Sequence, residues 1–178
     1  MESNSNGRKS PNKSSIAQRL DKGKNEIQDS KRYYKKSESI KILEEKAFQA
    51  TKEKYPSVPY PKQTKYRDDT ANGLTKAVID WLRLEGWQAE RINCIGQKLH
   101  IKGRETWIPS SGQKGTADIS ATIKGRSVKL EIKCAATGDK YQSYEQKLYQ
   151  KEVERSGGIY GIVRDFEGFY TWYQNFVK

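Results

Sequence analysis

Histidine and cysteine are scarce in this sequence of 178 residues, which contains only His100, Cys94 and Cys134. A structural zinc site takes four ligands that are mostly of these types, and a disulfide framework takes several spaced cysteine pairs. Neither pattern fits the residues found here, so we expect two buried or half-buried thiols in a reducing compartment. The single histidine lies in an alternating segment flanked by loops, which argues against a histidine-based nucleophile relay.

Long apolar runs are also absent. No stretch approaches the roughly 20 apolar residues that span a bilayer, and the first residues, MESNSNGRKSPNKSS, lack the hydrophobic centre of a signal peptide. We therefore expect a soluble, cytoplasmic protein with no membrane partner.

Negative charge is in short supply. The chain carries 34 Lys and Arg against 22 Asp and Glu, a net charge of +12 with a pI near 9.6. Residues 1–65 hold 16 of these cations and 8 of the anions, a net of +8, which leaves +4 for residues 66–178. Such a positive field attracts polyanions, so nucleic acid is the leading partner.

The N-terminal third divides into three segments. The first thirty-odd residues are rich in Ser, Asn, Lys and Gln, a composition that predicts disorder. Residues 38–54 place apolar side chains at helical spacing, which predicts an amphipathic helix that docks on its own domain, on a second copy or on DNA. Three prolines in YPSVPYP predict an extended linker. We accordingly predict a basic extension over residues 1–65 and a folded domain over residues 66–178.

The folded domain begins with a helix. Its apolar residues follow the spacing i, i+3, i+4, i+7, i+8: Leu74, Ala77, Val78, Trp81 and Leu82. Gly86 is placed to end it. A strand over residues 87–96 and a hairpin that turns at Lys102-Gly103 follow.

In the C-terminal part, helical spacing predicts a helix over residues 142–155 that packs through Tyr144, Leu148 and Val153. The segment IYGIVRD predicts a strand buried on both faces, and FEGFYTWY predicts a last strand. The order is α-β-β-β-α-β. We expect an α/β fold of the α+β type, with a mixed sheet of four to five strands flanked by helices.

A central hairpin carries the most informative pattern. The segment TADISATIKGRSVKLEIK has two alternating runs around Lys124-Gly125, which suits a two-residue turn. Pairing about that turn makes opposite residue numbers sum to 249, so that Asp118 faces Glu131, and Lys133 follows on the same face. Two facing acids destabilise a sheet unless a cation lies between them, and a divalent metal is the natural candidate. A solvated sheet face with charges of both signs is the alternative.

Asp118, thirteen positions before Glu131-x-Lys133, resembles the PD-(D/E)XK nuclease superfamily on this element order. The segments GTADI, LEIK, YEQKLYQKEVERSGG and IYGIVRD resemble its VRR-NUC branch, which is similar to archaeal Holliday junction resolvases. The similarity covers residues 70–169. It implies a restriction-endonuclease-like core and a nuclease dependent on Mg²⁺ or Mn²⁺.

The resemblance also assigns roles. It implies that Asp118, Glu131 and the backbone carbonyl of Ile132 bind the metal, while Lys133 orients the attacking water. Gln146 matches an active-site glutamine of the family, but Ser143-x-x-Gln146 is also a capping box, and the two interpretations stay equally open.

Further residues are less clearly placed. Lys114, in a glycine-flanked loop, and Lys129, on the polar face of the hairpin, are predicted to contact nucleic acid, although a loop lysine is commonly just solvated. Many relatives place a glutamate on the first helix, where this chain has Asn72 and Thr75. Asp69 could replace that acid, and helix capping is the alternative role for it.

Three functions remain open at this point. The resemblance implies an endonuclease acting on branched DNA, and symmetric cutting of two strands implies a homodimer. A nuclease of looser preference, which nicks DNA or processes flaps, is the second. A catalytically silent nucleic-acid-binding module is the third. Repair, recombination, a mobile element or a phage are all compatible contexts.

Overall fold

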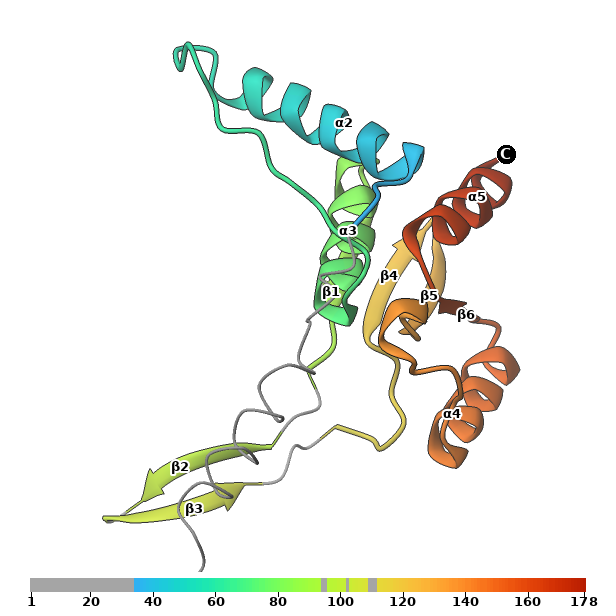
Figure 1. Cartoon of the computed structure of the whole chain (residues 1–178). Helices are drawn as coiled ribbons and strands as arrows, with labels where there is room; N and C mark the ends of the chain where they lie inside the picture. The colour runs from blue at the N-terminus through green and yellow to red at the C-terminus, as the bar shows by residue number, and fades with distance from the viewer. Residues whose placement is uncertain (1–33, 94–95, 102, 109–111) are drawn as a thin grey trace, which may run out of the picture. The chain divides into compact units, whose positions relative to one another are not determined.

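The structure, a computed structural model, describes residues 34–93, 96–101, 103–108 and 112–178. One compact unit spans Tyr34–Lys178 (Figure 1). The disorder predicted for the first thirty-odd residues and the thiol of Cys94 lie outside the described residues. Within those residues, no helix is both long and apolar enough to cross a membrane.

Four α-helices and six strands make up the described part of the chain. The helices are α2 (Glu38–Lys54), α3 (Ala71–Leu84), α4 (Tyr144–Arg155) and α5 (Phe166–Val177), with a short 3₁₀ turn, η1, at Ala135–Thr137. The strands are β1 (Gln88–Arg91), β2 (Gln97–Ile101), β3 (Arg104–Ile108), β4 (Ile119–Ile123), β5 (Arg126–Ile132) and β6 (Ile159–Val163).

The main sheet is mixed and has the strand order β1-β4-β5-β6. β1, β4 and β5 pair antiparallel, whereas β6 joins β5 in parallel after the α4 crossover. β2 and β3 form a separate two-stranded hairpin inserted between β1 and β4, as predicted around Lys102-Gly103. The predicted α+β fold with a mixed sheet is confirmed (Figure 1).

The central hairpin has the predicted register. Ile119 pairs with Leu130, which gives the sum of 249 expected for a turn at Lys124-Gly125. Both turn residues have positive φ, 50° and 74°, as a type I′ turn requires. The apolar side chains of the two strands are all buried, so the hairpin presents one face to the core and its polar face to the site.

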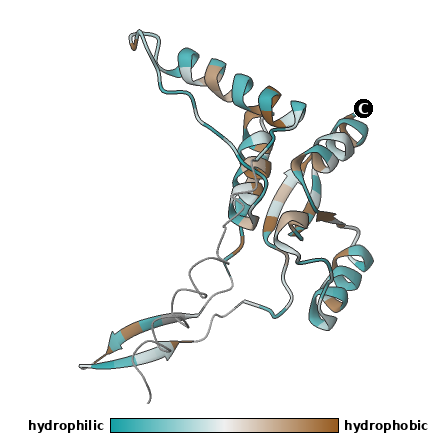
Figure 2. Cartoon of the chain, viewed as in Figure 1, coloured by the Kyte–Doolittle hydropathy of each residue, from teal (hydrophilic) through white to brown (hydrophobic). Residues whose placement is uncertain are grey.

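Helix α3 covers the buried face of the sheet. Its five predicted apolar residues are all at most 3% exposed. Thr70 caps its first turn by accepting a hydrogen bond from the Gly73 N–H, and Gly86 follows its end with φ of 85°. In Figure 2 hydrophobic residues concentrate along α3 and the strands it contacts, whereas α4 is largely hydrophilic.

Helix α2 has the predicted bounds and docks on its own domain. Ile40 and Leu43 are completely buried, and the Glu44 carboxylate accepts hydrogen bonds from the Tyr66 N–H and from Lys36. The compact unit accordingly begins at Tyr34 rather than at the predicted boundary of residue 66. The reason is packing between elements, which the apolar spacing of one helix does not reveal.

The predicted last strand is wrong, because FEGFYTWY forms the start of helix α5. Its aromatic residues favour strands by propensity, yet Phe166, Phe169 and Tyr173 recur at helical spacing and are buried. The rings of Phe166 and Tyr173 contact Trp81. Asp165 caps the helix by accepting a hydrogen bond from the Gly168 N–H. Burial of the aromatic stripe and the cap together outweigh the strand propensity.

The predicted packing of α4 and the predicted burial of β6 also need correction. Tyr144 and Leu148 do not pack, since they are 71% and 47% exposed, and no residue of α4 is fully buried. Instead Tyr149 meets the Tyr160 ring edge to face, at 6.3 Å between centroids. β6 is an edge strand with Ile162 39% exposed, so it is not buried on both faces as predicted.

Candidate active site

Asp118 and Glu131 occupy opposite positions at the open end of the β4–β5 ladder. Extension of the register places them in one cross-strand pair, directly beyond Ile119 and Leu130. Hydrogen-bonded and non-hydrogen-bonded pairs alternate from the two-residue turn, so this pair is of the non-hydrogen-bonded type, in which side chains lie closest. The Asp118 main-chain oxygen accepts a 2.8 Å hydrogen bond from the Ile92 N–H, which fixes the start of β4 next to the end of β1.

Ile132 contributes its backbone to the same corner. Its N–H donates a 2.8 Å hydrogen bond to Oδ2 of Asp118, while the next N–H, that of Lys133, points the other way to the Val163 oxygen of β6. The N–H and C=O of one strand residue point to the same side. The Ile132 carbonyl therefore faces Asp118, and its side chain is buried in the core.

Glu131 is the most enclosed acid of the site, with 2% exposure. Gln146 donates a hydrogen bond to its Oε1, and the Tyr160 hydroxyl lies 3.5 Å from its Oε2. Burial is the main cause that raises the pKa of Glu131, to about 7, and the negative charge of Asp118 adds to it. The negative charges of Asp118 and Glu131 are therefore not fully compensated by nearby cations.

Lys133 supplies part of the compensating positive charge. Its side chain is 8% exposed, and its Nζ lies 3.5 Å from Oε1 of Glu131 and 3.1 Å from Oδ2 of Asp139. The ammonium group offsets some of the carboxylate repulsion and lowers the pKa of Glu131 accordingly. The N–H groups of its ammonium can also donate hydrogen bonds to a bound anion or water.

Gln146 forms the predicted capping box and also contacts Glu131. Its Oε1 accepts a 2.8 Å hydrogen bond from the Ser143 N–H, while the Ser143 hydroxyl accepts one from the Gln146 N–H, which completes the capping box. Its Nε2 donates to Glu131. One amide thus closes the first turn of α4 and fixes that turn over the acid pair.

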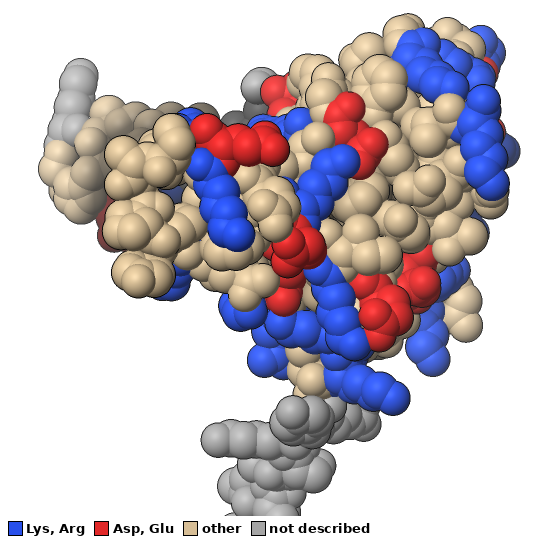
Figure 3. Space-filling model, turned by 90° about the horizontal axis from the view of Figure 1, so that it is seen from above, with Lys and Arg blue, Asp and Glu red and all other residues tan. Residues whose placement is uncertain are grey.

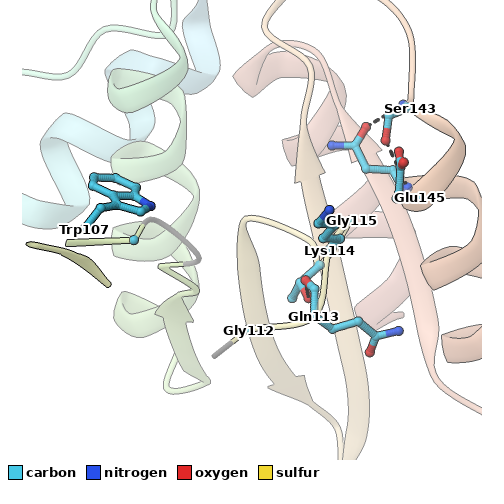
Figure 4. Close-up of a pocket in the computed structure, with 10 residues that line it drawn as sticks. Trp107, Gly112, Gln113, Lys114, Gly115, Ser143 and Glu145 are labelled. Atoms are coloured by element: carbon cyan, nitrogen blue, oxygen red, sulfur yellow. Dashed lines mark hydrogen bonds between the residues drawn. The ribbon is translucent and has the colours of Figure 1, made fainter. Parts of the chain in front are cut away.

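A loop before β4 packs on the same helix turn. Gly115 has φ of 81°, and a Cβ there would lie 2.5 Å from the Glu145 oxygen and 2.7 Å from the Gln146 nitrogen. Only glycine allows this approach. Figure 4 shows Lys114 and Gly115 beside this turn, in a pocket of about 510 Å³ that has Trp107 on its other side. Lys114 is exposed at the edge of that pocket.

Two predicted candidates have local partners instead. Lys129 donates a 2.6 Å hydrogen bond to the Ser120 hydroxyl on the polar face of the hairpin. Asp69 pairs with the Arg67 guanidinium and does not cap α3, because Thr70 does so. Asn72 and Thr75 bring no acid, so the structure offers no replacement for the missing helix carboxylate at these positions.

Sequence reasoning missed two residues of the site. Asp139 follows η1 and reaches Lys133, and Tyr160 on β6 reaches Glu131. Burial and the charge of Glu131 raise the pKa of Tyr160, so its hydroxyl keeps its proton. The parallel register that pairs Lys129 with Tyr160 would have revealed the tyrosine, but only once the β5–β6 pairing was known.

The oxygen atoms of this corner suit a hard divalent cation. Mg²⁺ usually binds one or two carboxylates and keeps several waters. This corner offers two carboxylates, those of Asp118 and Glu131, and the backbone carbonyl of Ile132. Among the residues that the structure describes, no group of three or more His, Cys, Asp or Glu side chains could hold a metal ion. Water and substrate phosphate would complete the coordination.

Comparison with known proteins gives no match: no family model, no curated protein and no solved structure resembles the chain closely enough to be reported. Any functional assignment therefore depends on the geometry of the site. That geometry consists of two adjacent acids, a backbone carbonyl, a buried lysine and a helix-anchored amide.

Proposed function

We propose that this protein is a divalent-metal-dependent endonuclease that hydrolyses phosphodiester bonds in DNA, with branched or structured DNA as the substrate. One observation carries the proposal. Glu131 is buried opposite Asp118, and both Lys133 and Gln146 reach the same Glu131 oxygen. A solvated sheet face, the competing interpretation of this hairpin, would leave these side chains exposed and separately hydrated.

Asp118, Glu131 and the Ile132 carbonyl would hold the metal ion. When bound, Mg²⁺ or Mn²⁺ would polarise the phosphate and lower the pKa of a bound water. The raised pKa of Glu131 supports this role, because a carboxylate pair that lacks a counter-ion gains most from a dication. The protein fixes the two carboxylates through the β4–β5 register and the hydrogen bond from Ile132 to Asp118.

Lys133 and Gln146 would act on the reacting oxygens. Lys133 lies within 3.5 Å of Glu131, so its ammonium can hold the attacking water and offset charge on the pentacoordinate phosphorus. Gln146 keeps Glu131 in one orientation through its Nε2. Asp139 also pairs with Lys133, at 3.1 Å, and would position it.

The substrate class follows from charge and from the resemblance. The net charge of +12 favours a polyanion, and Lys114, which is exposed beside the first turn of α4, would contact its phosphates together with Lys129. The similarity of the motifs to junction resolvases favours branched DNA. Paired incisions in a four-way junction take two active sites, so we propose a homodimer on the substrate.

The decisive test is a cleavage assay with the full chain. Linear duplex, flap, single strand and four-way junction would be incubated with Mg²⁺ or Mn²⁺, with EDTA, and with the Asp118→Asn and Glu131→Gln variants. We expect cleavage only with metal and only with both acids, and the fastest cleavage on the junction. Both variants should keep or improve DNA binding, because each removes a negative charge that opposes it.

The assay also separates the competing functions. Faster cleavage of flaps than of junctions would favour the nuclease of looser preference. Binding without cleavage under every metal condition would favour the silent binding module. Undiminished cleavage in EDTA would reject the metal mechanism altogether.

A further inference from the structure

One face of α4 is exposed along its whole length and carries a pattern that the active site does not use. Residues three or four positions apart on a helix share a face, and this face carries Tyr144, Lys147, Leu148, Lys151 and Arg155, all exposed. We call these five residues the α4 stripe. The opposite face of the helix packs on β6 through Tyr149 and Val153.

The cations of the α4 stripe are not engaged by the protein. Within the described part of the chain, Lys147, Lys151 and Arg155 form no ion pair or side-chain hydrogen bond. Two acids on the flanks of α4 are held elsewhere, Glu152 by Gln113 and Glu154 by Gln150. The stripe is therefore a run of three free positive charges.

Another face of the molecule is different. In Figure 3 lysine and arginine side chains interleave with aspartate and glutamate. The ion pairs of α2 and α3 are of this kind: Lys36 with Glu44, Lys41 with Glu38, and Lys76 with Asp80. Paired surface charge attracts a polyanion weakly, so the net positive charge of the folded unit acts mainly where cations lack partners.

Two aromatic rings accompany the free cations. Tyr144 is 71% exposed and Tyr141, three residues earlier, is 83% exposed. Neither tyrosine is fixed by the core, and a flat ring between cations is the arrangement on which unpaired bases stack. A paired duplex hides its base faces and would use only the charges.

The position of the stripe relates it to the acid pair. It begins at Tyr144, between the N-cap Ser143 and Gln146, whose side chain contacts Glu131. From there the 12 residues of α4 extend about 18 Å. Lys147, Lys151 and Arg155 follow one another along it at intervals of four residues, about 6 Å.

We propose that the α4 stripe, together with Tyr141, binds a single-stranded segment of nucleic acid and leads it to the acid pair. Lys147, Lys151 and Arg155 contact successive phosphates, and Tyr141 and Tyr144 stack on bases. Delivery of the strand to Asp118 and Glu131 rests on the proposed nuclease function. The evidence for the binding surface is independent of that function: its residues are exposed and its cations lack ion pairs with the residues that the structure describes.

The test compares two triple variants of the full chain with equal net charge. Lys147→Gln, Lys151→Gln and Arg155→Gln remove the cations of the stripe. Lys35→Gln, Lys62→Gln and Lys178→Gln remove three exposed cations on other segments that form no ion pair with any residue the structure describes. Glutamine keeps helix propensity close to that of lysine, and circular dichroism would check that both variants fold.

Binding of a fluorescent oligothymidylate would be measured in EDTA, so that no strand is cut. Three lost phosphate contacts should weaken binding by about 10- to 100-fold and reduce the slope of log K against log salt by about 2 for a single strand. The control triple should change both quantities much less. Replacing Lys147 and Lys151 with arginine should retain binding.

The tyrosines give an independent readout. Tyr141→Leu with Tyr144→Leu should weaken single-strand binding by about tenfold or more while duplex binding changes little. Equal losses on both substrates would mean that the rings do not stack on bases. Equal losses for the two triple variants would mean that only net charge matters, and either result overturns the proposal.

Cleavage measured in parallel separates this inference from the proposed function. If no DNA is cut with Mg²⁺ or Mn²⁺ but the stripe triple alone loses binding, the binding surface stands and the nuclease proposal fails. If the wild-type protein cuts DNA and the triple variant of the α4 stripe cuts and binds like the control variant, the proposed binding surface is rejected and the proposed nuclease function is retained.

Discussion

Replacement of Glu131 by glutamine removes a buried negative charge that faces Asp118 and keeps the size of the side chain. Burial, with the added effect of Asp118, raises the pKa of Glu131 from 4.5 to about 7 in the folded protein. Between these values the folded state binds a proton that the unfolded chain has released. The contribution of this group to stability is therefore fully present below pH 4.5, falls as pH rises, and is lost above about pH 7.

The size of the effect follows from the same interval. One pKa unit corresponds to about 1.4 kcal/mol, so ionised Glu131 costs the folded state about 3 kcal/mol at pH 8. In Glu131→Gln the side chain is neutral at every pH, so this cost does not arise. Its side-chain oxygen can still accept the hydrogen bond from Gln146, and its new N–H groups can donate to Asp118. We expect the variant to unfold at higher urea than wild type at pH 8.

Urea unfolding of both proteins in EDTA, at pH 5 and at pH 8, measures this difference. The free energy of unfolding of wild type should fall relative to the variant by about 2–3 kcal/mol between the two pH values. Addition of Mg²⁺ at pH 8 should stabilise wild type, because the metal binds only the folded state. The variant should gain much less and should not cut DNA.

A matched control uses an exposed acid. Glu53→Gln on α2 should change neither the pH dependence nor the response to Mg²⁺, since Glu53 is exposed and pairs with no cation among the described residues. Parallel pH profiles for wild type and Glu131→Gln would refute the claim that this carboxylate is destabilised by burial and by Asp118. The metal-binding role would lose its main physical support with it.

Three further predictions concern the supports of the site. Gly115→Ala should cost more than about 2 kcal/mol of stability, because it adds a backbone clash with α4 to the cost of positive φ, and should reduce cleavage; thermal unfolding measures the first. Gln146→Glu should leave α4 intact, because Ser-x-x-Glu also forms a capping box, but should abolish cleavage by repelling Glu131; circular dichroism and the cleavage assay separate the two effects. Deletion of residues 1–33, with a net charge of +4 from eight cations and four anions, should weaken DNA binding and leave the fold intact, whereas deletion of residues 1–65 should unfold the domain. Ile40 and Leu43 on α2 alone contribute about 3–6 kcal/mol of burial, which urea unfolding would register.

Controls for these predictions come from the same chain. Gly125→Ala has comparable positive φ but open space around the new methyl group, so its loss should stay near 1–2 kcal/mol and leave cleavage unchanged. Equal losses at the two glycines would contradict the close approach at α4. Wild-type turnover in Gln146→Glu would remove that amide from the site, and a stable protein lacking residues 1–65 would show that α2 is dispensable.

The sequence by itself determined the parts that depend on local rules. Alternation with period two and a two-residue turn specify the register of the β4–β5 hairpin, which is why Asp118 and Glu131 could be paired by arithmetic. The apolar stripe of α3 and the glycine after it are likewise local. Each of these features is encoded within fewer than twenty consecutive residues.

Only the tertiary structure decided the rest. It made α5 a helix, because its aromatic stripe is buried against α3, and it placed α2 in the core. It also turned Tyr144 and Leu148 outward, since β6 takes the opposite face of α4. Asp139 and Tyr160 joined the candidate site, and Gln146 connected the helix cap to Glu131, through contacts between elements distant in sequence. Such contacts depend on which surfaces bury one another, and a pattern within one segment carries no record of its neighbour.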